Sequence, residues 1–467
     1  MITSLSLQNF KAWENTDDVS FGPITAFFGS NSSGKTSFLQ SLLLLKQTAE
    51  SADRGRVFDL GSTTSALVNL GTFHDLIFSH DENRTLGISM DWQEDEPFQI
   101  QNTDKEDQPP IAEDRDLHLA VEVSVVRQTP VVQYVEYGLG DKVFCMNRGP
   151  KNEYSLEADN YKFIRVQGRA WPLPPPGKFY SFPDQVRAYY QNAAFLSDLE
   201  LQFEKLCRRI YYLGPLRQDP ERTYTWGGGH PADVGKRGEY AVQALIASQS
   251  EGKKDNARGL IHRSDGVRRT KLMSVEQHVA EWLQELGLIS SFDVKPIDTR
   301  GTIYQVAVKR TPNSPEVMLT DVGFGVSQVL PILVLLAYIP QGSIVLLEQP
   351  EIHLHPAVQS GLADIIIEAA KVRNLQIVLE SHSEHLLMRL QRRLAEREVG
   401  PGYSLEPEDC KFYFCQPGEN GSEIEQLALD QYGNITNWPD DFFGNAFGEA
   451  AAMNKAARRR AIRERNS

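Results

Sequence analysis

The chain has 467 residues, of which 41% are hydrophobic and 24% charged, and its formal net charge is −14 at pH 7. These values are typical of a globular protein with two or three lobes and exclude a disordered or fibrous chain. The negative charge argues against a surface that coats nucleic acid, and the apolar runs are too short to span a bilayer, so we expect a cytoplasmic protein. Cys410 and Cys415 would lie on opposite faces of one strand, as core thiols.

The first motif lies near the start of the chain. An alternating apolar pattern over residues 1–10 predicts a strand, and ITAFFG at 24–29 predicts a buried one. The second strand runs into G-x-x-x-x-G-K-T, from Gly29 to Thr36, and an apolar-faced helical pattern follows over 38–50. A strand, a glycine-rich turn and a helix start together indicate a P-loop, whose backbone N–H groups converge on phosphates.

This P-loop predicts a bound nucleoside triphosphate, ATP with Mg²⁺. Lys35 would place a positive charge at the β- and γ-phosphates, and the Thr36 hydroxyl would be a Mg²⁺ ligand. The loop residues predicted to bind nucleotide are Gly29, Ser30, Asn31, Ser32, Ser33, Gly34, Lys35, Thr36 and Ser37.

The middle of the chain carries patterns but no comparable motif. Residues 91–116 are acidic and contain prolines, which predicts an exposed loop. Alternating segments such as 117–126 predict strands of a β-rich lobe. From about 184 to 285 the pattern turns helical. Because no long heptad run is present, we expect a compact inserted lobe rather than a coiled-coil arm.

Basic residues in this region and at the C-terminus have two interpretations each. Arg217 and Arg222 would either reach an anion across a subunit boundary, as arginine fingers do, or form ordinary salt bridges. The basic runs at 253–271 and 455–465 are either solvated surfaces or contacts to nucleic acid or a protein partner.

Two further motifs lie close together in the C-terminal half. Within residues 319–339, Gly323, Gly325 and Ser327 open an apolar helical pattern, which concentrates free N–H groups at a helix start. Directly downstream, SIVLLE at 343–348 predicts a buried strand that ends in a carboxylate.

A helical pattern at 355–374 and a second buried strand, LQIVLESHS at 375–383, follow. Strand, helix and strand with continuous apolar runs predict a parallel sheet covered on both faces. The carboxyl ends of such strands would bring Glu348 and His382 to one edge, where a nucleotide would sit. We expect Glu348 to be the carboxylate on the Mg²⁺ side of the nucleotide.

In this order the motifs resemble the ABC-type ATPase heads of the SMC, RecF and OLD group, and EQPEIHLHP followed by SHSEHLL is most similar to the OLD-type branch. The resemblance makes GSNSSGKT the Walker A motif, SIVLLE the Walker B strand and EIHLHP the D-loop that contacts a second subunit. DVGFGVSQ stands at the signature motif, whose residues Gly323, Gly325 and Ser327 would bind the γ-phosphate held by the partner subunit. His382 would be the switch histidine.

The resemblance implies an α/β fold, a P-loop ABC-ATPase head with a mixed or parallel sheet covered by helices. An N-terminal ATPase lobe with a β-rich part would span 1–180, an inserted, mainly helical lobe 181–315, a C-terminal ATPase lobe 316–400 and a C-terminal extension with a basic tail 401–467. The extension is similar to the domain of unknown function that ends some bacterial AAA-family ATPases. It has no carboxylate cluster of the Toprim type, so we expect no built-in nuclease.

Gln349 departs from the family pattern. In the related heads a glutamate at this position orients or deprotonates the attacking water, whereas glutamine can position water but cannot accept its proton. Because phosphoryl transfer depends largely on positioning and electrostatics, we expect slow ATP hydrolysis, with Glu351 or Gln349 addressing the water. The predicted catalytic residues are Glu348, Gln349, Glu351 and His382, and the predicted metal ligands are Thr36 and Glu348.

The implied function is that of an ATPase that forms a homodimer or higher homo-oligomer around ATP–Mg²⁺. It would control a separate effector, a nuclease or toxin, in bacterial antiphage defence. One alternative is a RecF- or SMC-like DNA-binding ATPase in repair, for which nucleic acid would be a partner. A second alternative is an ATP-binding scaffold with little turnover, for which Gln349 is the discriminating residue. We expect no membrane partner.

Overall fold

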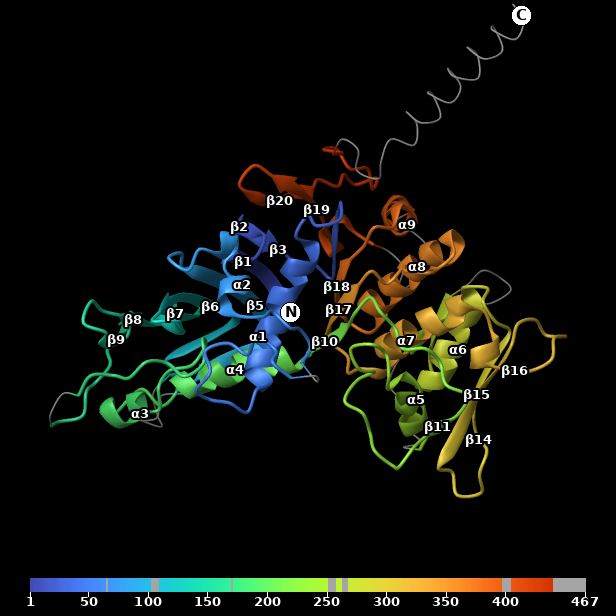
Figure 1. The fold of residues 1–467 in the computed structure, drawn as a ribbon, viewed down its shortest axis with the longest axis horizontal. Coiled ribbons are helices and arrows are strands. Elements are labelled where there is room, and N and C mark those ends of the chain that lie inside the picture. Colours follow the sequence, from blue (N-terminus) through green and yellow to red (C-terminus); the bar gives the residue numbers. More distant parts are fainter. Residues whose placement is uncertain are drawn as a thin grey trace, which may run out of the picture.

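The computed structural model is built on a six-stranded central sheet in which five neighbouring strands run parallel (Figure 1). It describes residues 1–63, 66–101, 109–168, 171–250, 258–262, 268–396 and 405–439. The strand order is β10 (Ile210–Leu213), β17 (Ile344–Glu348), β18 (Gln376–Glu380), β4 (Ile24–Gly29), β19 (Cys410–Gly418) and the antiparallel β20 (Gly421–Leu427). The strand that leads into the P-loop, β4, is therefore separated from β17 by β18.

The central strands are apolar along their whole length because both faces of the sheet are covered. Every residue of β4, β17 and β18 is buried. Within β4, Phe27 packs into one hydrophobic core, and its neighbours Ala26 and Phe28 pack into the other. This arrangement confirms the prediction of an α/β fold with a parallel sheet covered by helices.

The helices divide between the two faces of the central sheet. The first core holds α1 (Lys35–Glu50) and α4 (Leu196–Arg208). The second holds α5 (Ala241–Ser250), α6 (Val275–Glu285), α7 (Phe324–Tyr338), α8 (Pro356–Val372) and α9 (Glu384–Ala395). Short helical turns complete the described chain, namely α2 (Phe73–Leu76), η1 (Phe78–His80), α3 (Gln185–Tyr189), η2 (Leu319–Asp321) and η3 (Pro407–Asp409).

An antiparallel sheet covers α1 on the side away from the central sheet (Figure 1). Its strands are β2 (Trp13–Asn15), β1 (Ile2–Phe10), β5 (Leu86–Ile100), β6 (Ala112–Val126), β7 (Thr129–Leu139), β8 (Lys142–Arg148) and β9 (Tyr154–Asp159), with β3 (Val19–Ser20) paired to β1. The prediction of an exposed loop over 91–116 was wrong, because most of that stretch belongs to the paired strands β5 and β6. Residues 102–108 lie outside the described residues.

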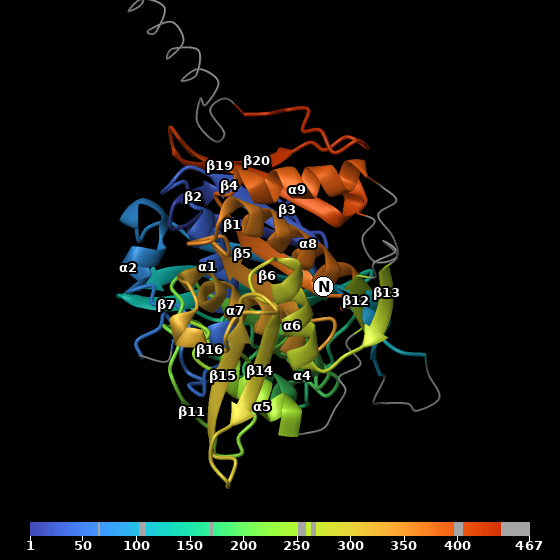
Figure 2. The ribbon, with the colours of Figure 1, turned by 90° about the vertical axis from the view of Figure 1, so that its right-hand side faces the viewer.

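The inserted part of the chain contributes a smaller sheet as well as helices. The strands β11 (Tyr224–Thr225), β15 (Ile303–Lys309), β14 (Ser291–Pro296) and β16 (Val317–Met318) form this sheet, and β12 (Arg258–His262) pairs with β13 (Arg268–Leu272). Figure 2 shows β14, β15 and α5 at the end of the molecule opposite β19 and β20. The predicted boundaries at 180, 315 and 400 stay predictions.

Two expectations about the chain as a whole can be compared with the structure. Cys410 and Cys415 are buried free thiols in the two different cores, so they lie on opposite faces of β19 as predicted. Over the described residues, none of the helices combines the length and apolar character needed to cross a bilayer.

Candidate nucleotide site

The turn between β4 and α1 depends on two glycines. Gly29 has a φ of +138°, and a Cβ at this position would lie 2.0 Å from the carbonyl oxygen of Cys415 on β19. Gly34 is the N-cap of α1 with a φ of +90°, and a Cβ there would lie 2.8 Å from the Trp13 ring. Because a side chain fits neither the dihedral angles nor the space, the loop can wrap closely over the start of α1 only with glycine at both positions.

Lys35 is held inside this loop. Its Nζ donates hydrogen bonds to the carbonyl oxygens of Gly29 (3.1 Å) and Ser30 (2.6 Å) and to Ser33 Oγ (3.3 Å). The residue is 3% exposed, and burial lowers the pKa of its ammonium group. The loop therefore places a buried cation where phosphate oxygens would arrive.

The neighbouring Thr36 contacts a carboxylate that sequence analysis did not single out. Thr36 Oγ1 donates a hydrogen bond of 2.8 Å to Oε2 of Glu380, the last residue of β18. Gln349 Nε2 lies 3.5 Å from the other Glu380 oxygen. Glu380 is 2% exposed, and burial raises its pKa, against the opposing effects of Thr36 and Lys35.

A cavity of about 590 Å³ lies over the loop and the start of α1. It is lined by Ala12, Asn31, Ser32, Ser33, Gly34, Lys35, Thr36, Ser37, Gln349, Glu380 and His382. Burial and the charge of Lys35 lower the pKa of His382. The structure thus brings most of the predicted loop residues together with Gln349 and His382, and adds Glu380; we call this space the phosphate cavity.

Two predicted carboxylates do not line the phosphate cavity. Glu348 is hydrogen-bonded to Tyr212 on β10 and lies near Arg217; burial, and then the charge of Glu380, raises its pKa to about 7. Glu351 Oε1 accepts a hydrogen bond of 2.6 Å from the backbone N–H of His382, and burial raises the pKa of this carboxyl too. Both side chains are more than nine-tenths buried.

The turn after β17 brings Gln349 to the phosphate cavity. Gln349 has a φ of +43°, and its N–H donates to the Glu380 carbonyl oxygen at 2.8 Å. His353 also has a positive φ, of +62°, and Nδ1 of His355 accepts a hydrogen bond from Ala357 N–H at the start of α8. A positive φ is energetically unfavourable for a residue other than glycine, so this turn needs stabilising contacts, and these hydrogen bonds supply them.

The signature residues lie away from this chain's own phosphate cavity. Gly323 is the exposed N-cap of α7, and a Cβ at Gly323 or Gly325 would meet no atom within 4 Å. Ser327 is only 6% exposed and lines a small separate cavity with Tyr224.

The two arginines that the sequence left with two interpretations have different surroundings. Arg222 pairs with Asp321 at 3.0 Å near the signature motif. Arg217 is buried beside Glu348.

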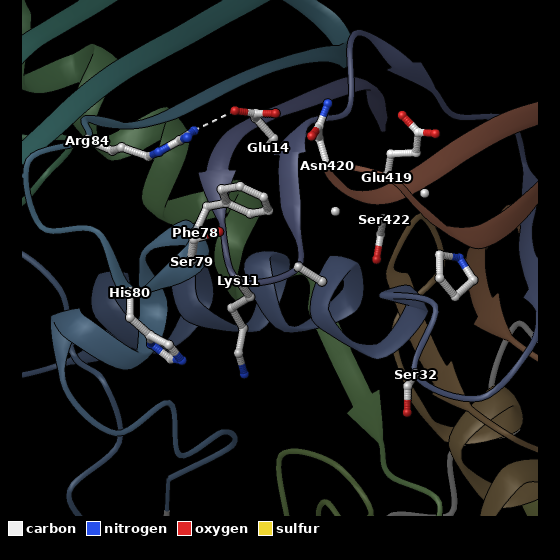
Figure 3. Close-up of a pocket in the computed structure, with 14 residues that line it drawn as sticks. Lys11, Glu14, Ser32, Phe78, Ser79, His80, Arg84, Glu419, Asn420 and Ser422 are labelled. Carbon is white, nitrogen blue, oxygen red and sulfur yellow. Dashed lines mark hydrogen bonds and ion pairs between the residues drawn. The ribbon is translucent and has the colours of Figure 1, made fainter.

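A second cavity of about 640 Å³ adjoins the first, and Figure 3 shows the side chains around it. Ala12 and Ser32 line both cavities. Arg84 pairs with Glu14 at 2.6 Å, and its guanidinium carbon lies 5.1 Å from the centre of the Phe78 ring. The remaining lining residues are Lys11, Ser79, His80, Pro417, Gly418, Glu419, Asn420, Gly421 and Ser422.

The sequence also matches a known family. Residues 1–184 and 241–387 match the family described as AAA ATPase domain (AAA_15). The chain belongs to this family. The match, with the P-loop and the covered parallel sheet, supports the predicted P-loop ATPase class, whereas the OLD-type branch stays a prediction. Residues 405–453 match a second family, described as a protein of unknown function (DUF3696). A search of curated proteins gave no match.

Among solved structures, the ATPase is similar to SMC heads. One is an SMC head bound to the C-winged helix domain of ScpA, with 12% identity, 92% of this chain and 98% of that chain covered, and a TM-score of 0.45. The SMC head domain from Thermotoga maritima has 10% identity, covers 92% and 99%, and has a TM-score of 0.40. An SMC head with an extended coiled coil, bound to the C-terminal domain of ScpA derived from Pyrococcus furiosus, is 12% identical to this chain. The match covers 92% of this chain and 96% of that chain, with a TM-score of 0.43.

Sequence reasoning missed several residues of this ATPase site. Glu380 carried a usable signal, because it ends the buried run LQIVLE in the same way that Glu348 ends SIVLLE, and the two residues are paired in register. Trp13, whose Nε1 donates to the Gly34 carbonyl oxygen at 3.2 Å, and Tyr212 carried no motif. Their roles depend on contacts between segments far apart in the sequence.

Proposed function

We propose that the chain binds ATP–Mg²⁺ at the phosphate cavity and hydrolyses it slowly. The observation that carries this proposal is the glycine-dependent loop folded around buried Lys35, beside a cavity that also reaches Gln349 and His382. Backbone N–H groups at the start of α1 and the Lys35 ammonium would bind the β- and γ-phosphates. His382, which lines the same cavity, would contact the γ-phosphate.

The second cavity would hold the nucleoside part of ATP. It shares Ala12 and Ser32 with the phosphate cavity, so the two spaces lie next to each other. Phe78 offers an aromatic surface, and Asn420 and Arg84 offer polar groups for the base and ribose. Most of the other lining residues are also polar or charged, so Phe78 is the aromatic surface on which the base would stack.

The oxygen groups at the sheet edge also suit Mg²⁺. Mg²⁺ prefers oxygen ligands and retains several waters, and the Thr36 hydroxyl and the carboxylates that end β17 and β18 form such a set. When bound, Mg²⁺ would neutralise charge on the phosphates. Thr36 is the proposed ligand from the loop, and Glu348 is the carboxylate that the sequence assigns to this role.

Slow turnover follows from the group that faces the proposed site of water attack. Gln349 lines the phosphate cavity, whereas Glu351 is engaged by the His382 backbone N–H. Gln349 would orient water through its amide but would not take its proton. If ATP is bound but never hydrolysed, the chain is instead the ATP-binding scaffold.

A second copy of the chain would complete the site. The N–H groups at Gly323 and Gly325 are at the start of α7 with open space above them, and they do not line this chain's own phosphate cavity. We infer that they close on the γ-phosphate of a partner in a homodimer formed around ATP. Ser327 would have to become exposed to take part.

We further propose that the ATPase controls a separate effector, a nuclease or toxin, in antiphage defence. The support is the resemblance of EQPEIHLHP and SHSEHLL to OLD-type ATPases. Phage plaque counts on cells carrying the gene with its neighbours, as wild type or Lys35→Ala, test this. Equal counts would reject it.

DNA binding is the competing function. The basic runs at 253–271 and 455–465, which suggested it, fall outside the residues whose side chains the structure describes. ATP-dependent DNA binding that weakens steeply with salt would favour this function over the effector proposal.

Phosphate release and equilibrium ATP binding, both measured with Mg²⁺, test the central proposal. Wild type should bind ATP and release phosphate slowly, and Lys35→Ala should bind ATP much more weakly and release no phosphate above background. Lys205→Ala removes an exposed lysine of α4 and is the matched control. Wild-type protein that neither binds nor hydrolyses ATP would overturn the proposal.

A further inference from the structure

Three buried carboxylates cluster at the carboxyl ends of β17 and β18, and they face different partners. Glu348, Glu351 and Glu380 are 6%, 7% and 2% exposed. Among the described residues that line the phosphate cavity, Glu380 is the one carboxylate. Its Oε2 accepts the hydrogen bond of Thr36, the residue whose hydroxyl is the proposed Mg²⁺ ligand.

Glu348 lies one strand further from the loop. Glu348 and Glu380 are directly paired across β17 and β18, and Glu380 is in turn paired with Phe27 of β4. Neighbouring strands are about 4.8 Å apart, so Glu348 is a full strand spacing further from β4 than Glu380 is. Its carboxylate is instead hydrogen-bonded to the Tyr212 hydroxyl and lies near the charge of Arg217.

The position of Gln349 fits this arrangement. Its Nε2 points to Oε1 of Glu380 at 3.5 Å, so the amide supports the carboxylate from the side opposite Thr36. A glutamate at 349 would place a second negative charge at this distance, and two close carboxylates repel. The amide at 349 avoids this repulsion and donates to the carboxylate instead.

We propose that Glu380 is the carboxylate that holds the Mg²⁺ side of the nucleotide site, with Gln349 positioning it, in place of Glu348. This proposal rests on the proposed ATP–Mg²⁺ binding. The carboxylate and the Thr36 hydroxyl lie on the wall of the phosphate cavity, where a hydrated Mg²⁺ on the β- and γ-phosphates would meet both. The Gln349 amide keeps the carboxylate turned toward Thr36.

The test is equilibrium ATP binding with Mg²⁺ and with EDTA. The dissociation constant in EDTA divided by that with Mg²⁺ is the Mg²⁺ ratio, which reports the metal contact without requiring turnover. Wild type should bind more tightly with Mg²⁺. Glu380→Gln should reduce that ratio about tenfold, the effect of losing one charge-assisted contact, and Glu348→Gln should reduce it much less. Glu200→Gln neutralises a buried glutamate of α4 that does not line the phosphate cavity and is the matched control.

A charge exchange sharpens the test. Gln349→Glu alone should weaken Mg²⁺-dependent binding, because it adds a like charge beside Glu380. The double variant Gln349→Glu with Glu380→Gln restores a single carboxylate and a single amide, and should recover part of the ratio. Recovery in the double variant would show that Glu380→Gln does not act through poor folding. Glu380→Asp keeps the charge on a shorter side chain, so its ratio should lie between those of wild type and Glu380→Gln.

The outcomes are distinct. A ratio lost in Glu348→Gln and kept in Glu380→Gln would overturn the inference while ATP–Mg²⁺ binding stands. A double variant whose ratio is no higher than the ratios of the two single variants would also overturn it. If wild type binds no ATP, the proposed function fails, and the inference fails with it.

Discussion

The two halves of the proposed ATP site differ in how far one chain completes them. At the P-loop, the ligand-binding groups already have partners, since Lys35 donates to loop oxygens and Thr36 donates to Glu380. At the start of α7, by contrast, Gly323 and Gly325 face open space, and Arg222 holds an exposed ion pair with Asp321. A single chain thus supplies partners for the groups of the P-loop half from its own atoms, whereas the glycines of the proposed signature half face open space.

The largest effect should come from Lys35→Ala, which removes the central cation of the self-contained half. ATP affinity should fall by about a hundredfold or more, because several charge-assisted contacts to phosphate are lost together. Isothermal titration would measure this, and an affinity within about threefold of wild type would show that Lys35 is not at the phosphates.

Gly323→Gln should distinguish the contributions of the two halves, because it should reduce turnover without reducing ATP binding. A Cβ at this exposed position meets no atom within 4 Å, so folding and ATP binding by the single chain should persist. Turnover should fall by about tenfold, because α7 can no longer close on a partner's phosphate. Phosphate release at several protein concentrations checks this. Unchanged turnover, with the same dependence on concentration, would mean that this half never closes.

Gly34→Ala should damage the loop rather than the chemistry. The substitution strains a residue with φ of +90° and pushes a Cβ to 2.8 Å from the Trp13 ring, so unfolding should become easier by about 1–3 kcal/mol. Chemical denaturation would report the change. Gly228→Ala, which shares a positive φ but meets no atom within 4 Å, separates the strain from the clash.

The smallest effect belongs to Arg222→Ala. Arg222 and Asp321 are 65% and 43% exposed, so their ion pair should contribute no more than about 1 kcal/mol to stability. Denaturation should therefore be nearly unchanged. If turnover nevertheless falls strongly at equal ATP affinity, Arg222 reaches a partner's nucleotide, as the arginine-finger interpretation requires.

A pH prediction concerns Glu200, which is outside both halves. Burial raises its pKa from 4.5 to about 7, so the folded chain holds its proton more tightly than the unfolded chain. Stability from this group is present below about pH 4.5 and is lost as the pH rises to about 7. Glu200→Gln should therefore stabilise the chain more at pH 8 than at pH 5, as seen in thermal unfolding.

Sequence could predict what is local and could not predict what depends on register. The P-loop is contiguous, and the covered strands show as apolar runs, so the fold and the position of Lys35 followed directly. Glu380 was missed because its contact with Thr36 exists only once β18 lies beside β4. The acidic stretch at 91–116 was misread because charged residues on the exposed face of an antiparallel pair resemble a loop in composition.

The close approach of Gly29 to Cys415 ties the P-loop to the C-terminal hairpin. The hairpin β19–β20 begins the region that matches a family of unknown function, and its turn at Gly418–Gly421 lines the second cavity. A Cβ at Gly29 would lie 2.0 Å from the Cys415 carbonyl oxygen, and β4 is paired with β19, so the start of the P-loop packs directly against the hairpin. Removing or reshaping this hairpin should therefore disturb the loop itself, because β19 and β20 are strands of the same central sheet as β4.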